Sequence, residues 1–354
     1  MQIVVACGGT GGHTFPGLAV AEELVKNGHQ VVVWTSGRAI EASVMKRWSG
    51  PVFSTHARKL SLLNLFSLIR SILRCRREMK REHPVALLAM GSYASLPPVI
   101  AARTCGVPVY LHEANTIPGK AVEFLAKFAK AVAISFEMTA RYLPSVRTVR
   151  TGLPIRADIA AGHRFEFIPP EAFVVFVTGG SQGAHAVNLL VSEALRMLQQ
   201  ELQQRAGVNR PLYVIHQTGS ADEAFVTEVY RSAAIPARVH GFETQMADAF
   251  ASADIVVARA GASTCFELAA CGKPALLIPL PTAIRDHQHY NAEAFVAVGA
   301  ADEVIQSKIS PQRFSRHLLN FYDHPERCAE MSARMKSLAI NDAAARVAKL
   351  VLEL

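Results

Sequence analysis

A chain of 354 residues that is 50% hydrophobic and only 19% charged is long enough for two domains with separate cores and too apolar to be disordered. Its longest apolar runs have the length of strands and one of them begins at residue 2, so neither a transmembrane helix nor a signal peptide is expected. The formal net charge of +8 is concentrated in residues 1–155, where 19 lysines and arginines stand against 8 acidic residues, and this predicts an anionic partner for that half.

Short apolar runs alternate with helical segments along the whole chain. In the first half, strands are predicted near residues 2–7, 30–35, 51–55, 85–90, 107–111, 130–134 and 146–150. In the second half, they are predicted near residues 172–178, 211–216, 236–240, 254–258, 274–278 and 301–304. Two or three helices close the chain, with breaks at residues 323–325 and 341–342. This alternation predicts an α/β fold with two doubly wound parallel sheets.

A domain boundary is predicted at Thr151–Pro154, where a glycine and a proline follow the last strand of the first half. We therefore expect a first domain over residues 1–153 and a second over residues 154–336. The closing residues 337–354 are expected to pack back on the first domain.

A glycine-rich turn, Gly8–His13, follows the first strand at once. Such a turn brings backbone N–H groups close to an anion at a positively polarised helix N-terminus. The pattern departs from a dinucleotide fingerprint, because Thr14 occupies the third glycine position and no acid ends the strand at 30–35, and this disfavours an NAD-dependent dehydrogenase. A helix N-terminus favours a neutral imidazole, so His13 is a candidate general base. The alternative is a turn residue that only donates to a backbone carbonyl.

The second half repeats this arrangement, with Gly179–Ala184 after the strand at 172–178 and Arg259–Glu267 after the strand at 254–258. Glu267 is a candidate to bind the paired hydroxyls of a ribose, with phosphates at the neighbouring loops. The alternative is a capping box, in which Thr264 is the N-cap and Glu267 reaches back to its N–H. Together the turns predict a phosphorylated ligand between two α/β domains.

Neither a metal nor a cofactor is expected. The chain has no Asp-x-Asp and no His, Asp or Glu cluster with clear metal-ligand spacing, and its six cysteines form no C-x-x-C pair, which suits a reducing cytosol. Helix N-termini and Arg156 are therefore the candidates to neutralise a bound diphosphate.

Five segments in this order closely resemble motifs of the MurG family of peptidoglycan N-acetylglucosaminyltransferases: Gly8–His13, His112–Asn115, Gly179–Ala184, Arg259–Glu267 and His287–Ala292. The resemblance covers essentially the whole chain and implies a GT-B fold, which is two facing Rossmann-like domains. It also implies transfer of N-acetylglucosamine, with inversion, from UDP-GlcNAc to the muramoyl-pentapeptide carried on undecaprenyl diphosphate. This is the conversion of lipid I to lipid II in peptidoglycan synthesis.

The resemblance implies a role for each matched residue, with His13 as the catalytic base. The implied contacts of the UDP-GlcNAc donor are Thr10, Gly11, Gly12, Asn115, Arg156, Ser181, Gln182, Phe242, Ala262, Thr264, Glu267 and Gln288. On the acceptor side, the implied residues are Gly91, Ser92, Tyr93, His112 and Glu113. The chain departs from the family at Ala89 and Ser92, where the family has glycines, so the acceptor contacts of this loop are left open.

The segment from Arg58 to Arg81 carries eight Lys or Arg, one Glu and a helical stripe of apolar residues. An ordinary surface helix would pack that stripe on the sheet. The density of cations beside surplus leucines instead predicts a peripheral contact with an anionic membrane, through Leu63, Phe66, Arg70, Arg74 and Arg77. Nucleic acid is disfavoured as a partner, because the segment lacks aromatic stacking platforms.

The expected location is therefore the cytoplasmic face of the cell membrane, with other cell-wall synthesis proteins as potential partners. Two alternatives stay open within the same fold, a lipid glucosyltransferase and a UDP-GlcNAc 2-epimerase, which would act on the donor alone. A third alternative, from another class, is a non-catalytic sensor of nucleotide sugars.

Overall fold

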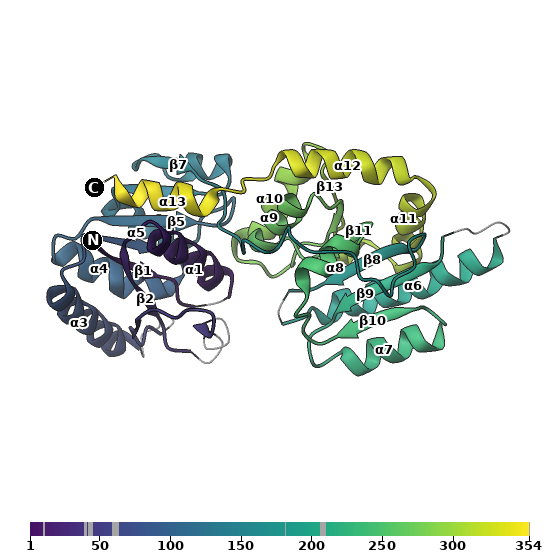
Figure 1. The fold of residues 1–354 in the computed structure, drawn as a ribbon, viewed down its shortest axis with the longest axis horizontal. Helices are drawn as coiled ribbons and strands as arrows, with labels where there is room; N and C mark the ends of the chain where they lie inside the picture. The colour runs from purple at the N-terminus through teal and green to yellow at the C-terminus, as the bar shows by residue number, and fades with distance from the viewer. Residues whose placement is uncertain are drawn as a thin grey trace. The chain divides into compact units, whose positions relative to one another are not determined.

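The computed structural model describes residues 1–9, 11–38, 41, 45–58, 64–180, 182–205 and 210–353. The chain divides into two compact units (Figure 1). The first unit comprises Met1–Ala157 and Ile340–Leu354, and the second comprises Asp158–Ala339. In the part of the chain that the structure describes, no helix is long and apolar enough to cross a membrane.

The first unit is built on a seven-stranded, wholly parallel sheet with the strand order β3-β2-β1-β4-β5-β6-β7. Its strands are β1 (Gln2–Ala6), β2 (Gln30–Thr35), β3 (Val52–Ser54), β4 (Ala86–Ala89), β5 (Val109–Glu113), β6 (Ala131–Ile134) and β7 (Thr148–Arg150). The strand order reverses between β1 and β4. In open parallel sheets, ligands bind beyond the carboxyl ends of the strands at such a reversal.

Helices cover both faces of this sheet. They are α1 (Gly11–Lys26), α3 (Leu65–Glu82), α4 (Leu96–Thr104), α5 (Lys120–Leu125) and α13 (Ala343–Leu352), with short 3₁₀ turns η2 (Tyr93–Ser95), η3 (Ala126–Phe128) and η4 (Glu137–Tyr142). Helices α1 and α13 share one core with the strands, in which Leu24 of α1 and Val347 of α13 are fully buried (Figure 1). The last helix of the chain therefore belongs to the core of the first unit.

The second unit repeats the architecture with six parallel strands in the order β10-β9-β8-β11-β12-β13. The strands are β8 (Phe173–Thr178), β9 (Leu212–Gln217), β10 (Ala237–His240), β11 (Ile255–Ala258), β12 (Ala275–Leu277) and β13 (Ala301–Glu303). Every residue of β8 is buried, as expected for a central strand covered on both faces. Here the order reverses between β8 and β11.

The helices of the second unit are α6 (His185–Gln204), α7 (Glu223–Ser232), α8 (Met246–Ser252), α9 (Ala262–Cys271), α10 (His287–Val296), α11 (Pro311–Asp323) and α12 (Pro325–Ser337), with 3₁₀ turns η5 (Ile284–Asp286) and η6 (Gln306–Lys308). Helix α6 and helix α11 pack with β8, β9 and β11 into one cluster. The prediction of two doubly wound parallel sheets is confirmed. The predicted helix breaks at residues 323–325 and 341–342 are also found.

Candidate donor and acceptor sites

The predicted site residues of the first unit lie at the carboxyl edge of its sheet. Gly11, Gly12 and His13 form the first turn of α1, directly after β1. Gly91, Ser92 and Tyr93 follow β4 across the reversal point, and a Cβ atom on Gly91 would lie 3.6 Å from His13 Cε1. The structure therefore brings the candidate base and the candidate acceptor loop together within one unit.

His13 is fixed by a hydrogen bond between its Nδ1 and the backbone carbonyl of Met90, at 2.9 Å. A carbonyl oxygen only accepts, so Nδ1 carries a proton and Nε2 is the basic nitrogen of the neutral ring. The alternative from the sequence was that His13 only donates a hydrogen bond to a backbone carbonyl. Nδ1 makes that bond, and Nε2 is the ring nitrogen that the proposed role as a base requires.

The loop from Gly8 to Gly9 is bound by two side chains of its own unit. The buried carboxylate of Glu41 accepts hydrogen bonds from the N–H of Gly9 at 2.6 Å and from the N–H of Gly37 at 2.9 Å. Ser92 Oγ donates to the carbonyl of Gly8 at 3.0 Å. Motif reasoning missed Glu41, because its partner Gly9 lies 32 residues earlier in the chain and no local pattern joins them.

Ser92 adopts φ 64° and ψ 172°, a backbone conformation that is almost confined to glycine and costs another residue roughly 1–3 kcal/mol. The position left open by the sequence therefore keeps the backbone that a glycine would adopt. Its side chain offsets the strain by bonding Gly8 and by accepting from the N–H of Ala94 at 3.1 Å.

His112 and Glu113, both predicted on the acceptor side, are buried at the end of β5. Burial lowers the pKa of His112 to about 4, and its Nε2 donates to the carbonyl of Gly152 at 3.2 Å. Burial also raises the pKa of the Glu113 carboxyl, against hydrogen bonds from Asn115 and Gly119 that favour the charged form. The Glu113 side chain therefore holds the loop that carries Asn115, whereas the His112 ring bonds Gly152.

Arg156 lies at the end of the first unit, with its guanidinium 5.7 Å from the ring centre of Phe15. Phe15 belongs to the second turn of α1, beyond His13. This contact places Arg156, the residue predicted to neutralise a diphosphate, near the start of α1.

In the second unit, the turn Gly179–Ala184 is packed too tightly for side chains at two of its glycines. A Cβ atom on Gly179 would lie 2.4 Å from the N of Ala184, and one on Gly183 would lie 2.0 Å from the O of Thr218. Gln182 is exposed on this turn. Gln217, which the sequence did not single out, braces the turn by donating to the carbonyl of Gly180 at 2.7 Å.

An aromatic side chain is exposed beyond β10, at the position where the resemblance implies a contact with the UDP-GlcNAc donor. Phe242 is 60% exposed, a high value for a phenylalanine. Its neighbour Glu243 is buried and paired with Arg238 at 2.8 Å, and this pairing lowers the pKa of Glu243 although burial opposes ionisation. Glu243 also accepts from the N–H of Gln245 at 2.8 Å, so the loop that presents Phe242 is held rigidly.

Helix α9 starts at Ala262 with Gly261 as its N-cap, and no side chain caps it. Thr264 therefore lies inside the first turn and is not the N-cap. The capping-box alternative for Glu267 is wrong, because it required the helix to begin three residues later, at Cys265. Thr264 and Glu267 are instead three residues apart on one helix, which places them on the same side of its first turns.

Gln288 follows β12 in the first turn of α10, and its Oε1 accepts from the N–H of Leu280 at 3.0 Å. Asn291, one turn later, is fully buried and donates to the carbonyl of Ala260 at 3.2 Å. Asn291 thus ties α10 to the turn before α9. The predicted donor contacts Ala262, Thr264 and Gln288 consequently share one edge of the second sheet.

A network of buried, hydrogen-bonded polar side chains lies next to the glycine turn at the same edge of the sheet. The ring of His216 bonds Tyr230 Oη at 2.8 Å and Asn188 Oδ1 at 3.1 Å, and Asn188 Nδ2 donates to Asp222 at 2.7 Å. Asp222 in turn accepts from His185, the first residue of α6 after the glycine turn, at 2.8 Å. Burial lowers the pKa of His216 to about 3, so the ring is neutral within this chain.

Helix α3 exposes the apolar stripe that a surface helix would bury. Its buried residues are Ser71, Cys75, Glu78 and Met79. The larger apolar side chains are exposed, with values of 56% for Leu65, 82% for Phe66, 48% for Ile69 and 58% for Leu73. Leu68 packs against the core of the unit. The alternative of an ordinary surface helix, which would pack the stripe on the sheet, therefore does not describe its most apolar part.

Three predicted residues, Thr10, Ser181 and Leu63, lie outside the described residues. Within the described part of the chain, no group of three or more His, Cys, Asp or Glu side chains could hold a metal ion. The described cysteines 7, 75, 105, 265, 271 and 328 are all free thiols.

Two doubly wound parallel sheets, each with a glycine-rich turn at its reversal point, are the arrangement of the GT-B fold, to which many glycosyltransferases belong. Residues 3–134 match the N-terminal domain of glycosyltransferase family 28, and residues 174–347 match its C-terminal domain. The crystal structure of MurG from Acinetobacter baumannii superposes with a TM-score of 0.80 at 29% identity, covering 100% of this chain and 99% of that one.

Relatives that match over nearly the whole chain lead to the same family. The UDP-N-acetylglucosamine–N-acetylmuramyl-(pentapeptide) pyrophosphoryl-undecaprenol N-acetylglucosamine transferase of Geobacter metallireducens is 36% identical, over 97% of this chain and 96% of the relative. Its counterpart in Myxococcus xanthus is 34% identical, over 100% and 93%. A UDP-GlcNAc 2-epimerase from Neisseria meningitidis, with a TM-score of 0.74 at 14% identity over 100% of both chains, shares the fold alone. The chain belongs to glycosyltransferase family 28 and, within it, to the MurG family, as the resemblance of its motifs predicted.

Proposed function

We propose that this chain transfers N-acetylglucosamine from UDP-GlcNAc to the muramoyl-pentapeptide carried on undecaprenyl diphosphate, with inversion at the anomeric carbon. The observation that carries the proposal is the 36% identity, over 97% of the chain, to a transferase named for that reaction. The geometry of each unit supports it, because one unit carries a candidate base and the other a candidate nucleotide site.

The proton of the acceptor hydroxyl goes to His13 Nε2. The hydrogen bond between Nδ1 and the Met90 carbonyl holds the ring in the tautomer whose Nε2 accepts. As the hydroxyl oxygen forms its bond to the anomeric carbon, the bond from that carbon to the UDP oxygen breaks, and the electron pair leaves with UDP. Attack from the face opposite UDP inverts the configuration.

The second unit holds UDP. Phe242 offers an exposed ring to the uracil, and Glu267 accepts from both ribose hydroxyls. The diphosphate lies at the N-termini of α6 and α9, where helix dipoles and Arg156 offset its charge without a metal. Thr264 and Gln288 complete the donor contacts, with Asn115 and Gln288 at the sugar.

The chain works at the cytoplasmic face of the membrane, as a peripheral protein that contacts anionic lipids through α3. The outward apolar stripe of α3 supports this proposal, since Phe66 is 82% exposed beside the cations Arg70, Arg74 and Arg77. Such a surface suits an acceptor whose polyprenyl tail stays in the bilayer. Other cell-wall synthesis proteins are its proposed partners at that face.

Acceptor dependence of UDP release tests the proposal. The purified chain should release UDP from UDP-GlcNAc only when a lipid-diphosphate muramoyl acceptor is added, and excess EDTA should leave the rate unchanged. A 2-epimerase would consume the donor without acceptor, and a sensor would release no UDP under either condition. Loss of activity in EDTA, restored by magnesium, would contradict the metal-free account of the leaving group.

A further inference from the structure

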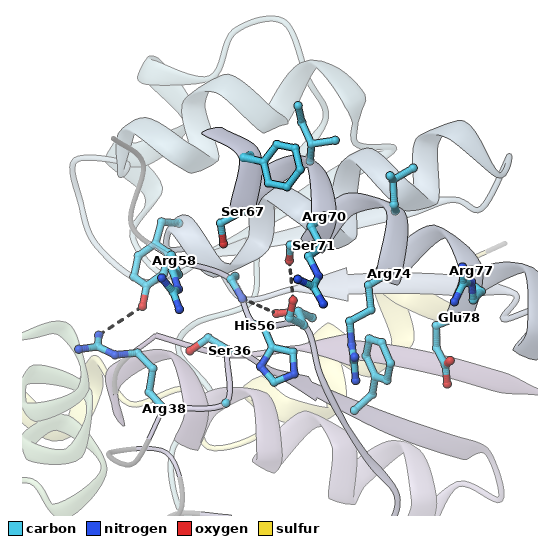
Figure 2. Close-up of a pocket in the computed structure, with 18 of the residues that line it drawn as sticks. Ser36, Arg38, His56, Arg58, Ser67, Arg70, Ser71, Arg74, Arg77 and Glu78 are labelled. Carbon is cyan, nitrogen blue, oxygen red and sulfur yellow. Dashed lines mark hydrogen bonds between the residues drawn. The ribbon is translucent and has the colours of Figure 1, made fainter. Parts of the chain in front are cut away.

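A large hollow of the first unit lies beneath α3, with a volume of about 1480 Å³ (Figure 2). Its walls are α3, the loop after β2 and the loop after β3. Figure 2 shows Arg38 and Arg58 at one end and Arg77 at the other, with Arg70 and Arg74 between them. Arg70 points from α3 toward His56.

The hollow carries a large uncompensated positive charge. Among the described residues, no ion pair joins Arg38, Arg58, Arg70, Arg74 or Arg77 to a carboxylate, and the lining acid Glu78 is paired with Arg81. Guanidinium groups prefer oxyanions such as phosphates, which they bind with two parallel hydrogen bonds. The chemistry of the lining therefore fits a phosphate-bearing ligand.

One end of the hollow reaches the candidate acceptor loop. Arg38 Nη1 donates to Tyr93 Oη at 3.3 Å, and Tyr93 also lines the hollow. A Cβ atom on Gly9 would lie 3.8 Å from Tyr93 Cε1, and Gly91 lies beside His13. A ligand group at Arg38 is thus separated from the catalytic imidazole only by the short loop Gly91–Tyr93.

In the glycine turn that precedes α1, two backbone groups already have hydrogen-bond partners within the unit. Gly9 donates its N–H to Glu41, and the carbonyl of Gly8 accepts from Ser92. The N–H of Gly9 is therefore committed within the unit and is not available to a diphosphate near His13.

We propose that the hollow beneath α3 binds the diphosphate of the polyprenyl acceptor, with Arg38 and Arg58 as its ligands. The inference rests on the proposed function and assigns the acceptor phosphates to guanidinium groups in place of the Gly8–Gly9 backbone. The sugar then extends past Tyr93 to His13. The polyprenyl chain leaves along the exposed apolar side chains of α3, where Phe66, Ile69 and Leu73 line the hollow.

Steady-state kinetics with a short-chain soluble diphosphate acceptor test this assignment. Arg38→Gln and Arg58→Gln should each raise the acceptor KM by about tenfold, as expected for a lost charge-assisted hydrogen bond, and leave the affinity for UDP unchanged. Arg76→Gln is the control, because Arg76 is an exposed arginine of α3 that lies outside the hollow. All three replaced side chains are exposed, so thermal melting should match that of the unmodified chain.

A second experiment measures binding at the hollow without turnover. Dimethylallyl diphosphate, a short prenyl diphosphate with no sugar, should bind in calorimetry with UDP saturating the donor site, and Arg38→Gln should weaken this binding by about tenfold. Unchanged acceptor KM in both arginine variants would overturn the inference. Vesicle flotation lost in Arg38→Gln, with unchanged acceptor KM, would overturn it in favour of a phospholipid phosphate. An unmodified chain that binds the probe but transfers no sugar would refute the proposed function and leave the binding assignment standing.

Discussion

His13 carries the chemical step in this account, and its replacement should separate chemistry from binding. His13→Ala should lower kcat by roughly 10²–10⁴-fold, the usual contribution of a general base, because the acceptor hydroxyl then loses its proposed base. UDP affinity should stay near that of the unmodified chain, since the nucleotide contacts lie in the second unit. The measurement is kcat by UDP release, with Kd for UDP by calorimetry.

His163→Ala serves as the control for this experiment. His163 is an exposed histidine of the second unit, and only its backbone N–H bonds, to Asp248. It should retain full activity. A His13→Ala enzyme within a few-fold of the unmodified rate would reduce His13 to a residue that only fixes the loop after β4.

Glu267 is proposed to bind both hydroxyls of the ribose, and its replacement should weaken UDP binding. Glu267→Ala should weaken UDP binding by about 2–3 kcal/mol, the range for lost hydrogen bonds to a charged group. A 2′-deoxy donor should lose much of the same energy, and the two losses should not add, because both remove one interaction. Calorimetry of the variant with both ligands measures this coupling. Glu293→Ala, an exposed acid on α10, is the matched control.

A simple outcome would contradict this assignment. If Glu267→Ala binds UDP normally and only melts at a lower temperature, then Glu267 stabilises α9 and does not contact the ribose. Full additivity with the 2′-deoxy donor would lead to the same conclusion, because it would mean that Glu267 and the 2′-hydroxyl act independently.

Helix α3 turns its apolar side chains outward, and this orientation predicts binding to anionic vesicles. Binding to anionic vesicles should fall steeply with salt, because each cation near the surface contributes on the order of 1 kcal/mol and salt screens it within about 10 Å. Phe66→Ser with Leu73→Ser should remove the remainder that persists at high salt, since these side chains are 82% and 58% exposed. Vesicle flotation across a salt series measures both parts.

The matched control for the membrane contact lies in the other unit. Phe225 is 46% exposed on α7, so Phe225→Ser removes a similar exposed ring far from α3 in the sequence. It should leave flotation unchanged. If the double change in α3 has no effect at high salt, the apolar contact with the bilayer lies outside this helix.

Local patterns predicted the elements well, and the reason is physical. Strands buried on both faces are continuous apolar runs, and β8 is buried at every residue, so its run in the sequence was unambiguous. The orientation of α3 was not predictable in this way. Its apolar stripe has helical spacing, but spacing does not reveal whether the sheet or the solvent faces it, and here the buried face carries Ser71, Cys75 and Glu78.

The candidate site was predictable where it depends on short motifs, such as His13 after its glycine turn and Thr264 with Glu267 on one helix. The start of α9 was misplaced in the capping-box alternative, because Ser, Thr and Gly are all acceptable N-caps and only the fold selects Gly261. Glu41 and Gln217 were missed for another reason. Their partners Gly9 and Gly180 are 32 and 37 residues away, so only the folded sheet brings them together.

For the whole molecule, buried histidines predict how stability depends on pH. The pKa of His216 is lowered to about 3 by burial, whereas in an unfolded chain it is near its ordinary value of about 6.5. Between these values, the unfolded state binds a proton that the folded state does not, so stability is lost as pH falls below about 6.5. The slope from this group is at most about 1.4 kcal/mol per pH unit. His112, with a pKa near 4, adds a similar dependence in the first unit.

Thermal unfolding between pH 7.5 and pH 5 checks this expectation. The melting temperature should fall as the pH is lowered, and His216→Gln should show a shallower fall. His163→Ala, which replaces an exposed histidine, should keep the original slope. A pH dependence identical in the unmodified chain and His216→Gln would mean that other groups set the acid sensitivity of the fold.

The central claim is that the two units together perform an inverting sugar transfer to a lipid-linked acceptor. It is tested most directly by the product formed from UDP-GlcNAc, labelled with carbon-13 at the anomeric carbon, and a short-chain muramoyl diphosphate acceptor. The account predicts one new glycosidic linkage on the acceptor, and its anomeric proton signal should have the large coupling of a β-linked sugar. An α-linked product, or label found only in free or epimerised sugar, would contradict the account.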